Sequence, residues 1–231
     1  WFGDGDVAFE AFRAGEVDSV REFNIAKWNT AYDFPAVRSG EVVRSLIPHD
    51  RPSGIAGFVM NTRRAPFNDW RVRDALIHAF NFEFVNAAIN AGEQPRITSY
   101  FSNSVLGMEA GPAEGRVAEL LAPFAGELLP GALEGYALPV SDGSEANRRN
   151  TREALRLLAE AGYTVEDGVM TNEMGGPLEF DILLQSGATQ MINVADLYVE
   201  ALARIGVDAE VITVDSAQYK ERTQVYDFDM T

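Results

Sequence analysis

The chain has 231 residues, of which 46% are apolar and 23% charged, enough apolar sequence to bury one large core or two small ones. Its formal net charge of −16 argues against nucleic-acid binding and against docking on anionic lipid, because both need a basic surface. The absence of cysteine from the sequence excludes disulfides, thiolate nucleophiles and cysteine-ligated metal sites. No apolar run approaches the roughly 18 residues that a membrane-spanning helix needs. Since the sequence starts at Trp1 without a leader and stops in a strand-like segment at Thr231, we expect it to be part of a longer protein.

The N-terminal part of the chain predicts short helices alternating with short strands. Residues 6–14, and a segment that begins near Ile25, have helix-like sequence. Residues 17–20 form a short strand candidate between them. Residues 42–47 and 55–60 are apolar runs bounded by Gly, Pro and Ser, which is typical of buried strands.

An amphipathic helix is predicted next, with Asn68 as its N-cap. Its apolar side chains have the spacing of one helix face: Val72, Ala75, Leu76, Ala79 and Phe80. Residues 91–148 carry Gly, Pro, Ser and Asn throughout. They are predicted to form a long, mostly irregular excursion with one short helix near residues 117–124.

Regular α/β structure is predicted for the C-terminal part of the chain. Asn150 is expected to cap a helix, with Glu153 at its third position. A strand at 178–184, a helix at 192–202 and a strand at 207–214 then form a βαβ unit, whose crossover is expected to be right-handed. The predicted fold class is α/β, with a mixed β-sheet flanked by helices.

Two polar loops are the predicted ligand-binding site, because ligands of open α/β sheets bind where strands end and helices begin. The first candidate loop follows the predicted strand at 178–184 and supplies Gln185, Ser186 and Gln190. The start of the next helix offers free backbone N–H groups there to an anion or a carbonyl.

The second candidate loop follows the predicted strand at 17–20 and consists of Arg21, Glu22, Phe23 and Asn24. A cation, an anion, an aromatic ring and an amide together suit a peptide or a zwitterion. The alternative for both loops is an ordinary connection whose polar groups satisfy one another.

Other residue constellations do not predict chemistry. His49 is expected to be a surface histidine in a turn and His78 to pack at the edge of a core, and two histidines without cysteine make a zinc site uncommon. Trp28, Tyr32 and Phe34 are expected to be core residues. The sequence has no nucleophile elbow, Walker lysine loop or dinucleotide-binding glycine motif after a strand. We therefore predict no catalytic residue, no metal ligand and no cofactor, and expect the protein not to be an enzyme.

Several segments together resemble the family 5 extracellular solute-binding proteins, the oligopeptide-, dipeptide- and nickel-binding receptors of ABC importers. They lie, in the order and spacing of the family, at residues 12–18 (FRAGEVD), 58–61 (FVMN), 65–69 (APFND), 71–76 (RVRDAL), 154–163 (ALRLLAEAGY) and 202–211 (LARIGVDAEV). Residues 28–37 and 99–104 (SYFSNS) are similar to the Yej-type subgroup of oligopeptide and microcin-C receptors. The resemblance covers nearly the whole chain.

The resemblance implies one lobe of a type II (cluster C) periplasmic binding protein. Residues 1–231 are expected to be the second, ligand-binding lobe, with lobe I absent and the excursion at 91–148 included. The whole receptor would close on an oligopeptide or peptide-like ligand by a hinge motion, in the periplasm of a Gram-negative bacterium, and would deliver it to ABC permease subunits. No nucleic-acid partner and no direct membrane insertion are expected.

Two alternatives to the peptide receptor remain open at the level of the sequence. One is a receptor of the same family for a sugar, an opine or a metal chelate. The other is a hydrolase that uses carboxylates, which would require two acids converging at one cleft with perturbed pKa values.

Overall fold

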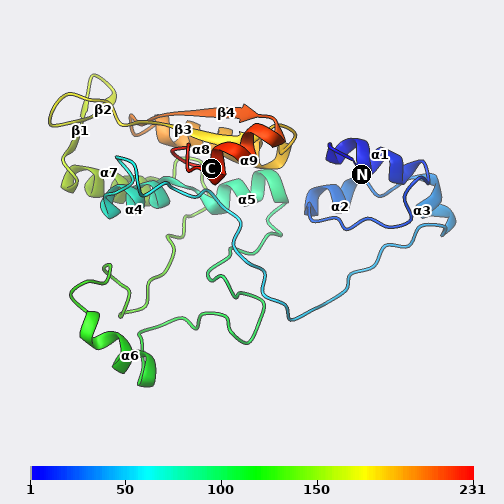
Figure 1. The fold of residues 1–231 in the computed structure, drawn as a ribbon, viewed down its shortest axis with the longest axis horizontal. Helices are drawn as coiled ribbons and strands as arrows, with labels where there is room; N and C mark the ends of the chain where they lie inside the picture. The colour runs from blue at the N-terminus through cyan, green and yellow to red at the C-terminus, as the bar shows by residue number, and fades with distance from the viewer. Residues whose placement is uncertain (1) are drawn as a thin grey trace.

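The computed structural model describes residues 2–231 (Figure 1). A helical unit at the N-terminus comprises α1 (Gly5–Arg13), α2 (Ile25–Thr30) and α3 (Pro35–Ser39). It lies to one side of a larger body that contains the sheet, and residues 41–57 run between the two as extended chain. The hydrophobic cores of the two parts are separate.

Aromatic side chains form the core of the N-terminal unit. Phe9 and Phe12 of α1 pack against Tyr32 and Phe34, with ring centroids of Phe9 and Tyr32 5.2 Å apart. Trp28 packs at the edge of this cluster, so the predicted core role of Trp28, Tyr32 and Phe34 is confirmed. Burial and the neighbouring carboxylate of Glu22 raise the pKa of Tyr32 to about 12.

The central feature of the body is a parallel pair of strands, β3 (Glu179–Gln185) and β4 (Asp208–Val214), in register from Glu179 opposite Asp208 to Gln185 opposite Val214. Helix α8 (Thr189–Ala203) connects them and is followed by Gly206, whose positive φ of 80° reverses the chain. The predicted βαβ unit is therefore confirmed in its elements and in its parallel pairing.

Two further segments extend this sheet. Met230 bridges Ile182 in a parallel sense and Met60 in an antiparallel sense. Backbone hydrogen bonds join Leu183 N–H to the Met230 carbonyl (2.8 Å) and Asn61 N–H to the Asp229 carbonyl (2.8 Å). Residues 229–231 thus lie between β3 and residues 59–61, which makes the sheet mixed, as predicted.

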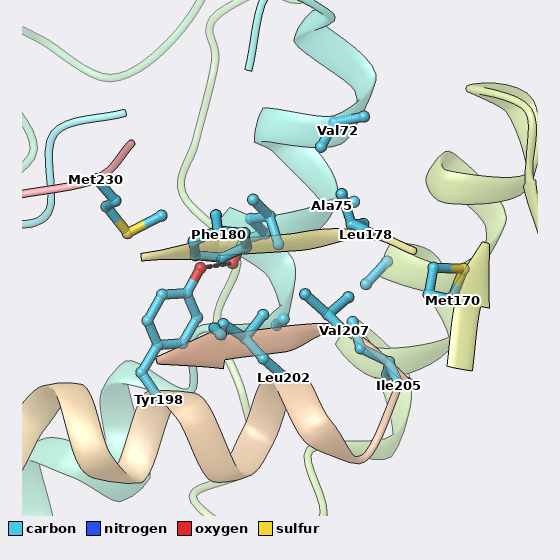
Figure 2. Packing of buried hydrophobic residues seen from close by; sticks show 14 of the residues in the cluster. Val72, Ala75, Met170, Leu178, Phe180, Tyr198, Leu202, Ile205, Val207 and Met230 are labelled. Atoms are coloured by element: carbon cyan, nitrogen blue, oxygen red, sulfur yellow. Dashed lines mark hydrogen bonds between the residues drawn. The ribbon is translucent and has the colours of Figure 1, made fainter. Parts of the chain in front are cut away.

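Helices pack on this sheet and bury its apolar face (Figure 2). They are α4 (Trp70–Ala79), α7 (Arg148–Glu160) and α8, and α4 packs along α7, whereas α5 (Phe82–Asn90) packs against α8. Inside this core Tyr198 is buried, and its hydroxyl donates to the carbonyl of Leu76 at 2.9 Å. The hydroxyl is therefore satisfied in an apolar environment, where an unpaired one would be costly.

The remaining elements lie at the periphery. A hairpin of β1 (Tyr163–Glu166) and β2 (Val169–Asn172) follows α7, and α9 (Ser216–Gln224) follows β4. The excursion at residues 91–148 contains α6 (Gly115–Leu121) and a 3₁₀ turn at Ala122–Phe124, and most of its other residues are irregular. In Figure 1 it loops away from the sheet.

Within residues 2–231, two predicted strands are absent and a third is reduced to a single bridge. Residues 17–20 and 42–47 belong to no ladder within residues 2–231, and of residues 55–60 only Met60 forms a bridge. An apolar extended segment becomes a strand only when another strand satisfies its backbone, and the described chain supplies none at the first two.

Two predicted helix caps are displaced. Helix α4 is capped by Asp69, whose carboxylate accepts from the Arg71 N–H at 2.8 Å, and not by Asn68. Helix α7 is preceded by Asn147, and Asn150 lies inside its first turn, where its amide donates to the Val140 carbonyl at 3.3 Å. Adjacent polar residues compete for the cap, so the sequence pattern locates a helix start only to within a few residues.

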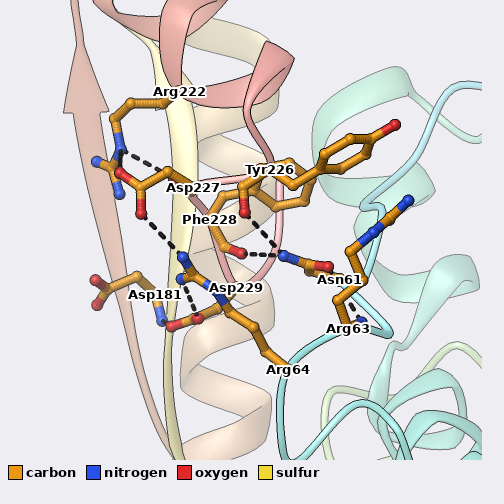
Figure 3. Close-up of polar contacts among 9 residues, drawn as sticks. All are labelled: Asn61, Arg63, Arg64, Asp181, Arg222, Tyr226, Asp227, Phe228 and Asp229. Atoms are coloured by element: carbon orange, nitrogen blue, oxygen red, sulfur yellow. Dashed lines mark hydrogen bonds and ion pairs between the residues drawn. The ribbon is translucent and has the colours of Figure 1, made fainter.

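Arginine side chains hold the last residues against the body (Figure 3). Arg64 donates to Asp227 at 2.9 Å and to Asp229 at 3.0 Å, and Arg222 donates to Asp227 at 3.1 Å. Asp229 also accepts from the Asp181 N–H of β3 at 3.2 Å. Asp227 and Asp229 are therefore members of an ion-pair network.

Removing the charge of Asp227 should destabilise the protein only at neutral pH. Hydrogen bonding to Arg64 and the charge of Arg222 lower the pKa of Asp227. A carboxyl with a lowered folded-state pKa stabilises the fold above its unfolded value of about 4, and this stabilisation is lost as pH falls through the folded value. The difference in Tm between the parent and Asp227→Asn, measured by thermal unfolding, should therefore be largest at pH 7 and vanish in acid.

The expected difference is small because this carboxylate is exposed. Asp18→Asn, at an exposed residue near the end of α1, is the matched control and should leave Tm unchanged throughout. A difference for Asp227→Asn that stayed constant from neutral to acid pH would contradict the ion-pair assignment.

Candidate functional site

The loop of Arg21, Glu22, Phe23 and Asn24 lies directly before α2. The side chains of Glu22 and Asn24 form hydrogen bonds that stabilise this loop. Glu22 accepts from the Asn24 N–H at 2.8 Å and from the Tyr32 hydroxyl at 3.1 Å. Asn24 caps α2 by accepting from the Lys27 N–H at 2.9 Å. Phe23 lies between these anchors with 85% of its surface exposed, and Arg21 is also exposed. Hydrogen bonds of Glu22 and Asn24 therefore fix the loop on both sides of Phe23, and the Phe23 ring faces solvent.

The loop from Gln185 to Gln190 follows β3, as predicted. The Ser186 N–H donates to the Val214 carbonyl at 2.7 Å, which fixes the loop to the end of β4, and the Ser186 side chain is exposed. Gln190 in the first turn of α8 donates to the side chain of Asn90 at 2.7 Å. Helix α8 begins without a side-chain cap, so the N–H groups of its first turn are directed to the space beyond the strand ends.

Both loops lie where the N-terminal unit meets the body. The carboxyl ends of β3 and β4 point toward α1 and α2 in Figure 1. An added Cβ on Gly187 would lie 3.5 Å from Oδ2 of Asp4, the N-cap of α1. Asn29 of α2 donates to Glu93, just beyond α5, at 3.3 Å. The structure thus brings the two predicted loops to the same end of the molecule, and their binding of a ligand stays a prediction.

Sequence reasoning missed the residues that complete this junction, namely Asp4, Asn90 and Glu93. Asp4 carries a recognisable signal, since an aspartate before a helix-like run predicts an N-cap. Asn90, at the end of α5, and Glu93, just beyond it, carry none, because they become neighbours of α8 and α2 only through tertiary packing.

Acidic groups outnumber basic ones around the junction. Asp4, Glu22 and Glu93 lie there, with Arg21 as an exposed cation. Lys27 is engaged within the N-terminal unit, where its ammonium lies 3.3 Å from Asp6 and 4.2 Å from the centroid of the Phe9 ring. The junction therefore favours the cationic part of a ligand over an anion.

Two hollows of about 430 Å³ lie away from the junction. One is lined by residues of α4, α7 and the segment before α7, including His78, Arg149 and Glu153. The other lies between α1 and α3 and is lined by Arg13 and Phe34 among others. Neither of these two hollows is lined by a residue of the two loops.

Three carboxylates with arginine partners do not have the properties of a general acid. Arginine partners lower the pKa of Asp69, Glu153 and Asp227, which keeps these carboxylates ionised at neutral pH. A general acid needs the opposite shift, as burial or a second carboxylate would produce. These residues therefore supply no proton donor for hydrolysis.

In open α/β sheets, ligands bind at the carboxyl ends of the strands, which is where the two candidate loops lie. The whole chain, residues 1–231, matches the family model for bacterial extracellular solute-binding proteins, family 5 Middle. The chain belongs to this family, which is one of solute-binding proteins and not of enzymes.

Relatives with similar sequences come from several bacteria. A protein of Brucella melitensis, named only as a binding protein, is 40% identical over 96% of this chain. Two proteins of Agrobacterium fabrum are each 38% identical: "Peptidoglycan-binding protein YepA" over 96% of this chain, and "Probable peptide-binding protein YejA" over 100%. The expected similarity to the Yej-type subgroup is thus confirmed. The chain spans 36% to 38% of the length of these three relatives.

Solved structures share the fold. NikA from Brucella suis, in complex with Fe(III)-EDTA, matches 99% of this chain with 39% of its own, at a TM-score of 0.62 and 19% identity. AppA from Bacillus subtilis, in complex with a nonapeptide, matches 99% of this chain with 38% of its own, at a TM-score of 0.62 and 18% identity. The prediction of an α/β fold of the type II periplasmic binding protein class is confirmed.

None of the helices in residues 2–231 combines the length and the apolar character that crossing a membrane requires.

Proposed function

We propose that this chain is part of the periplasmic substrate-binding component of an ABC importer, and that the whole protein captures oligopeptides or peptide-like solutes. In this proposal the ligand occupies the junction between the two candidate loops, and a hinge motion encloses it before delivery to the membrane permease. The observation that carries the proposal is the meeting of these loops, from two separately packed parts of the chain, at one end of the molecule.

The chemistry of the junction supports a peptide-like ligand. The free N–H groups of α8 suit carbonyl oxygens, the acidic groups suit an ammonium, and the exposed ring of Phe23 suits an apolar side chain. The names of the two Agrobacterium relatives, one peptide-binding and the other peptidoglycan-binding, agree with peptides or peptide-bearing fragments of peptidoglycan as the solute.

The proposal includes a periplasmic location in a Gram-negative bacterium. It is supported by the family's description as extracellular and by relatives in Brucella and Agrobacterium. The permease subunits would recognise the closed receptor, and energy for transport would come from their ATPase partner.

A receptor for a non-peptide solute is the second candidate. Its support is the range of ligands bound by structures of the same fold, which includes the Fe(III)-EDTA of NikA. Calorimetric titration of the full-length protein with short peptides, with peptidoglycan-derived peptides and with a metal chelate separates the candidates. Heat and a thermal shift with the chelate alone would reject the peptide assignment.

Replacing Phe23 by alanine in the full-length protein is expected to weaken binding of the best peptide by about tenfold, or about 1.4 kcal/mol. The reason is that the ring would lose its contact with the ligand while Glu22 and Asn24 keep the loop in place. Phe124→Ala, at a half-exposed ring of the excursion, is the matched control and should leave the calorimetric Kd unchanged. Equal affinity of the parent and Phe23→Ala would remove Phe23 from the site.

A further inference from the structure

The first turn of α8 has no side-chain cap to fix it. Its N-cap residue is Ala188, whose methyl group cannot accept a hydrogen bond. The loop before it is held at the end of β4 through the backbone, by the bond from the Ser186 N–H to the Val214 carbonyl at 2.7 Å. An uncapped first turn frays unless a tertiary contact holds it. The start of α8 therefore depends on what packs beside it.

One side-chain hydrogen bond joins this turn to another helix. Nε2 of Gln190 donates to Oδ1 of Asn90, the last residue of α5, at 2.7 Å. Within the described chain, residues 2–231, it is the only hydrogen bond that a side chain of residues 185–196 makes. Gln190 is half-buried and Asn90 is 7% exposed, so water competes little for this pair. The pair is thus the polar tie between α5 and the start of α8.

Asn90 is itself held in place by the turn that ends α5. Ala91 adopts a positive φ of 54° there. One helical turn before Asn90, the buried side chain of Asn86 accepts from the Gln94 N–H at 3.1 Å and donates to the Gln94 carbonyl at 2.9 Å. These two bonds close the turn, so the side-chain oxygen of Asn90 is a fixed acceptor to which α8 is tied.

The same bond determines what Gln190 can do at the junction. Its side chain is turned toward α5, and its amide nitrogen would have to leave Asn90 before it could reach a ligand. That exchange would leave a buried acceptor without this donor, which is costly. The exposed side chain of Ser186 and the N–H groups of the first turn of α8 remain as the groups that face a ligand on this side.

We propose that Asn90 is a positioning residue for ligand binding, and that Gln190 acts with it as an anchor and not as a ligand contact. This inference rests on the receptor function proposed above. The Asn90–Gln190 pair holds the first turn of α8 against α5, where the loop from Gln185 to Gln190 meets the ligand. The loop is then ordered before the ligand arrives, so the free energy of binding is not reduced by the entropy cost of ordering it.

Calorimetric titration of the full-length protein with trialanine and pentaalanine tests this role. Asn90→Ala and Gln190→Ala should each weaken binding about three- to tenfold, because the ligand must then order the start of α8. The double variant should bind no more weakly than either single variant, since the two residues act as one pair. The exchanged pair, Asn90→Gln with Gln190→Asn, keeps the combined length of the two side chains and should recover most of the affinity.

Asn150→Ala is the matched control. Asn150 is another buried asparagine, 6% exposed, and its amide donates to a backbone carbonyl away from the junction. Its replacement should lower Tm but leave Kd unchanged. Hydrogen exchange adds a local readout at residues 192–194, where the Ile192 N–H donates to the Ala188 carbonyl at 3.0 Å. These amides should exchange faster in Asn90→Ala and at the parent rate in Asn150→Ala.

A further loss of affinity from Gln190→Ala in the Asn90→Ala background would overturn the inference, because it would show that Gln190 contacts the ligand itself. An unchanged Kd for Asn90→Ala in a parent that binds peptide would overturn it as well, and would leave the receptor function standing. A parent that binds neither peptide would count against the proposed function. Unchanged exchange at residues 192–194 in Asn90→Ala would then reject the role of Asn90 independently.

Discussion

Replacing Phe67 by alanine is expected to lower the free energy of unfolding by about 3–5 kcal/mol. The Phe67 ring is fully buried and meets the Phe180 ring of β3 edge-on, with centroids 5.1 Å apart. The ring lies between the start of α4 and the sheet. Its removal leaves a cavity that α4 and the sheet cannot fill by moving together, because both are held by the rest of the core. Urea unfolding of the full-length protein, followed by tryptophan fluorescence, measures the change.

Phe124→Ala serves as the control for Phe67→Ala as well, because it deletes the same ring from a half-exposed position in the excursion. It should change the free energy of unfolding by less than about 0.5 kcal/mol. Similar losses for the two variants would mean that Phe67 does not occupy the core as described.

Replacing Asn61 by alanine is expected to cost about 2–4 kcal/mol in the free energy of unfolding. The Asn61 side chain is 3% exposed, and its amide donates to the carbonyls of Tyr226 (3.0 Å) and Phe228 (2.9 Å), as Figure 3 shows. Alanine would leave both carbonyls without this donor in a site that water does not easily reach. The same urea titration measures the loss.

Asn29→Ala is the control for Asn61→Ala, because it removes an exposed amide whose carboxylate partner, Glu93, can turn to water. It should have little effect on unfolding. Hydrogen exchange adds a local test: the amides of residues 226–231 should become less protected in Asn61→Ala while those of α7 do not. A uniform loss of protection would show that Asn61 does not act through the C-terminal segment.

The sequence predicted those parts of the fold that are specified locally. Helix α8 and its two neighbouring strands were predicted because apolar residues recur with a period of about 2 in the strands and about 3.6 in the helix. Gly206, which follows the helix, also marked its end. The excursion was found from its Gly, Pro, Ser and Asn content. The strand predictions at residues 17–20 and 42–47 failed because a strand also needs a partner strand, which can be far away in sequence.

The candidate site could be predicted only in part, because some of its features are specified by local sequence and others depend on tertiary contacts. The loop at Gln185 was placed correctly because the strand before it has a strong pattern of its own. The loop at Phe23 was found by its residue types, although no strand precedes it in the described chain. The roles of Glu22 and Asn24 in pinning that loop depend on Tyr32 and on the start of α2, which composition does not reveal.

The position of residues 229–231 between β3 and residues 59–61 also sets an order for folding. Asn61 is bonded to residues 165 and 167 positions later in the chain, whereas β3 and β4 are joined by a single helix. Closing the longer loop costs more entropy, so the β3–α8–β4 unit can assemble before residues 59–61 join the sheet. During synthesis, residues 59–61 leave the ribosome long before their partners, residues 229–231, have been made. Their backbone groups therefore stay unpaired with this segment until residues 229–231 have been synthesised.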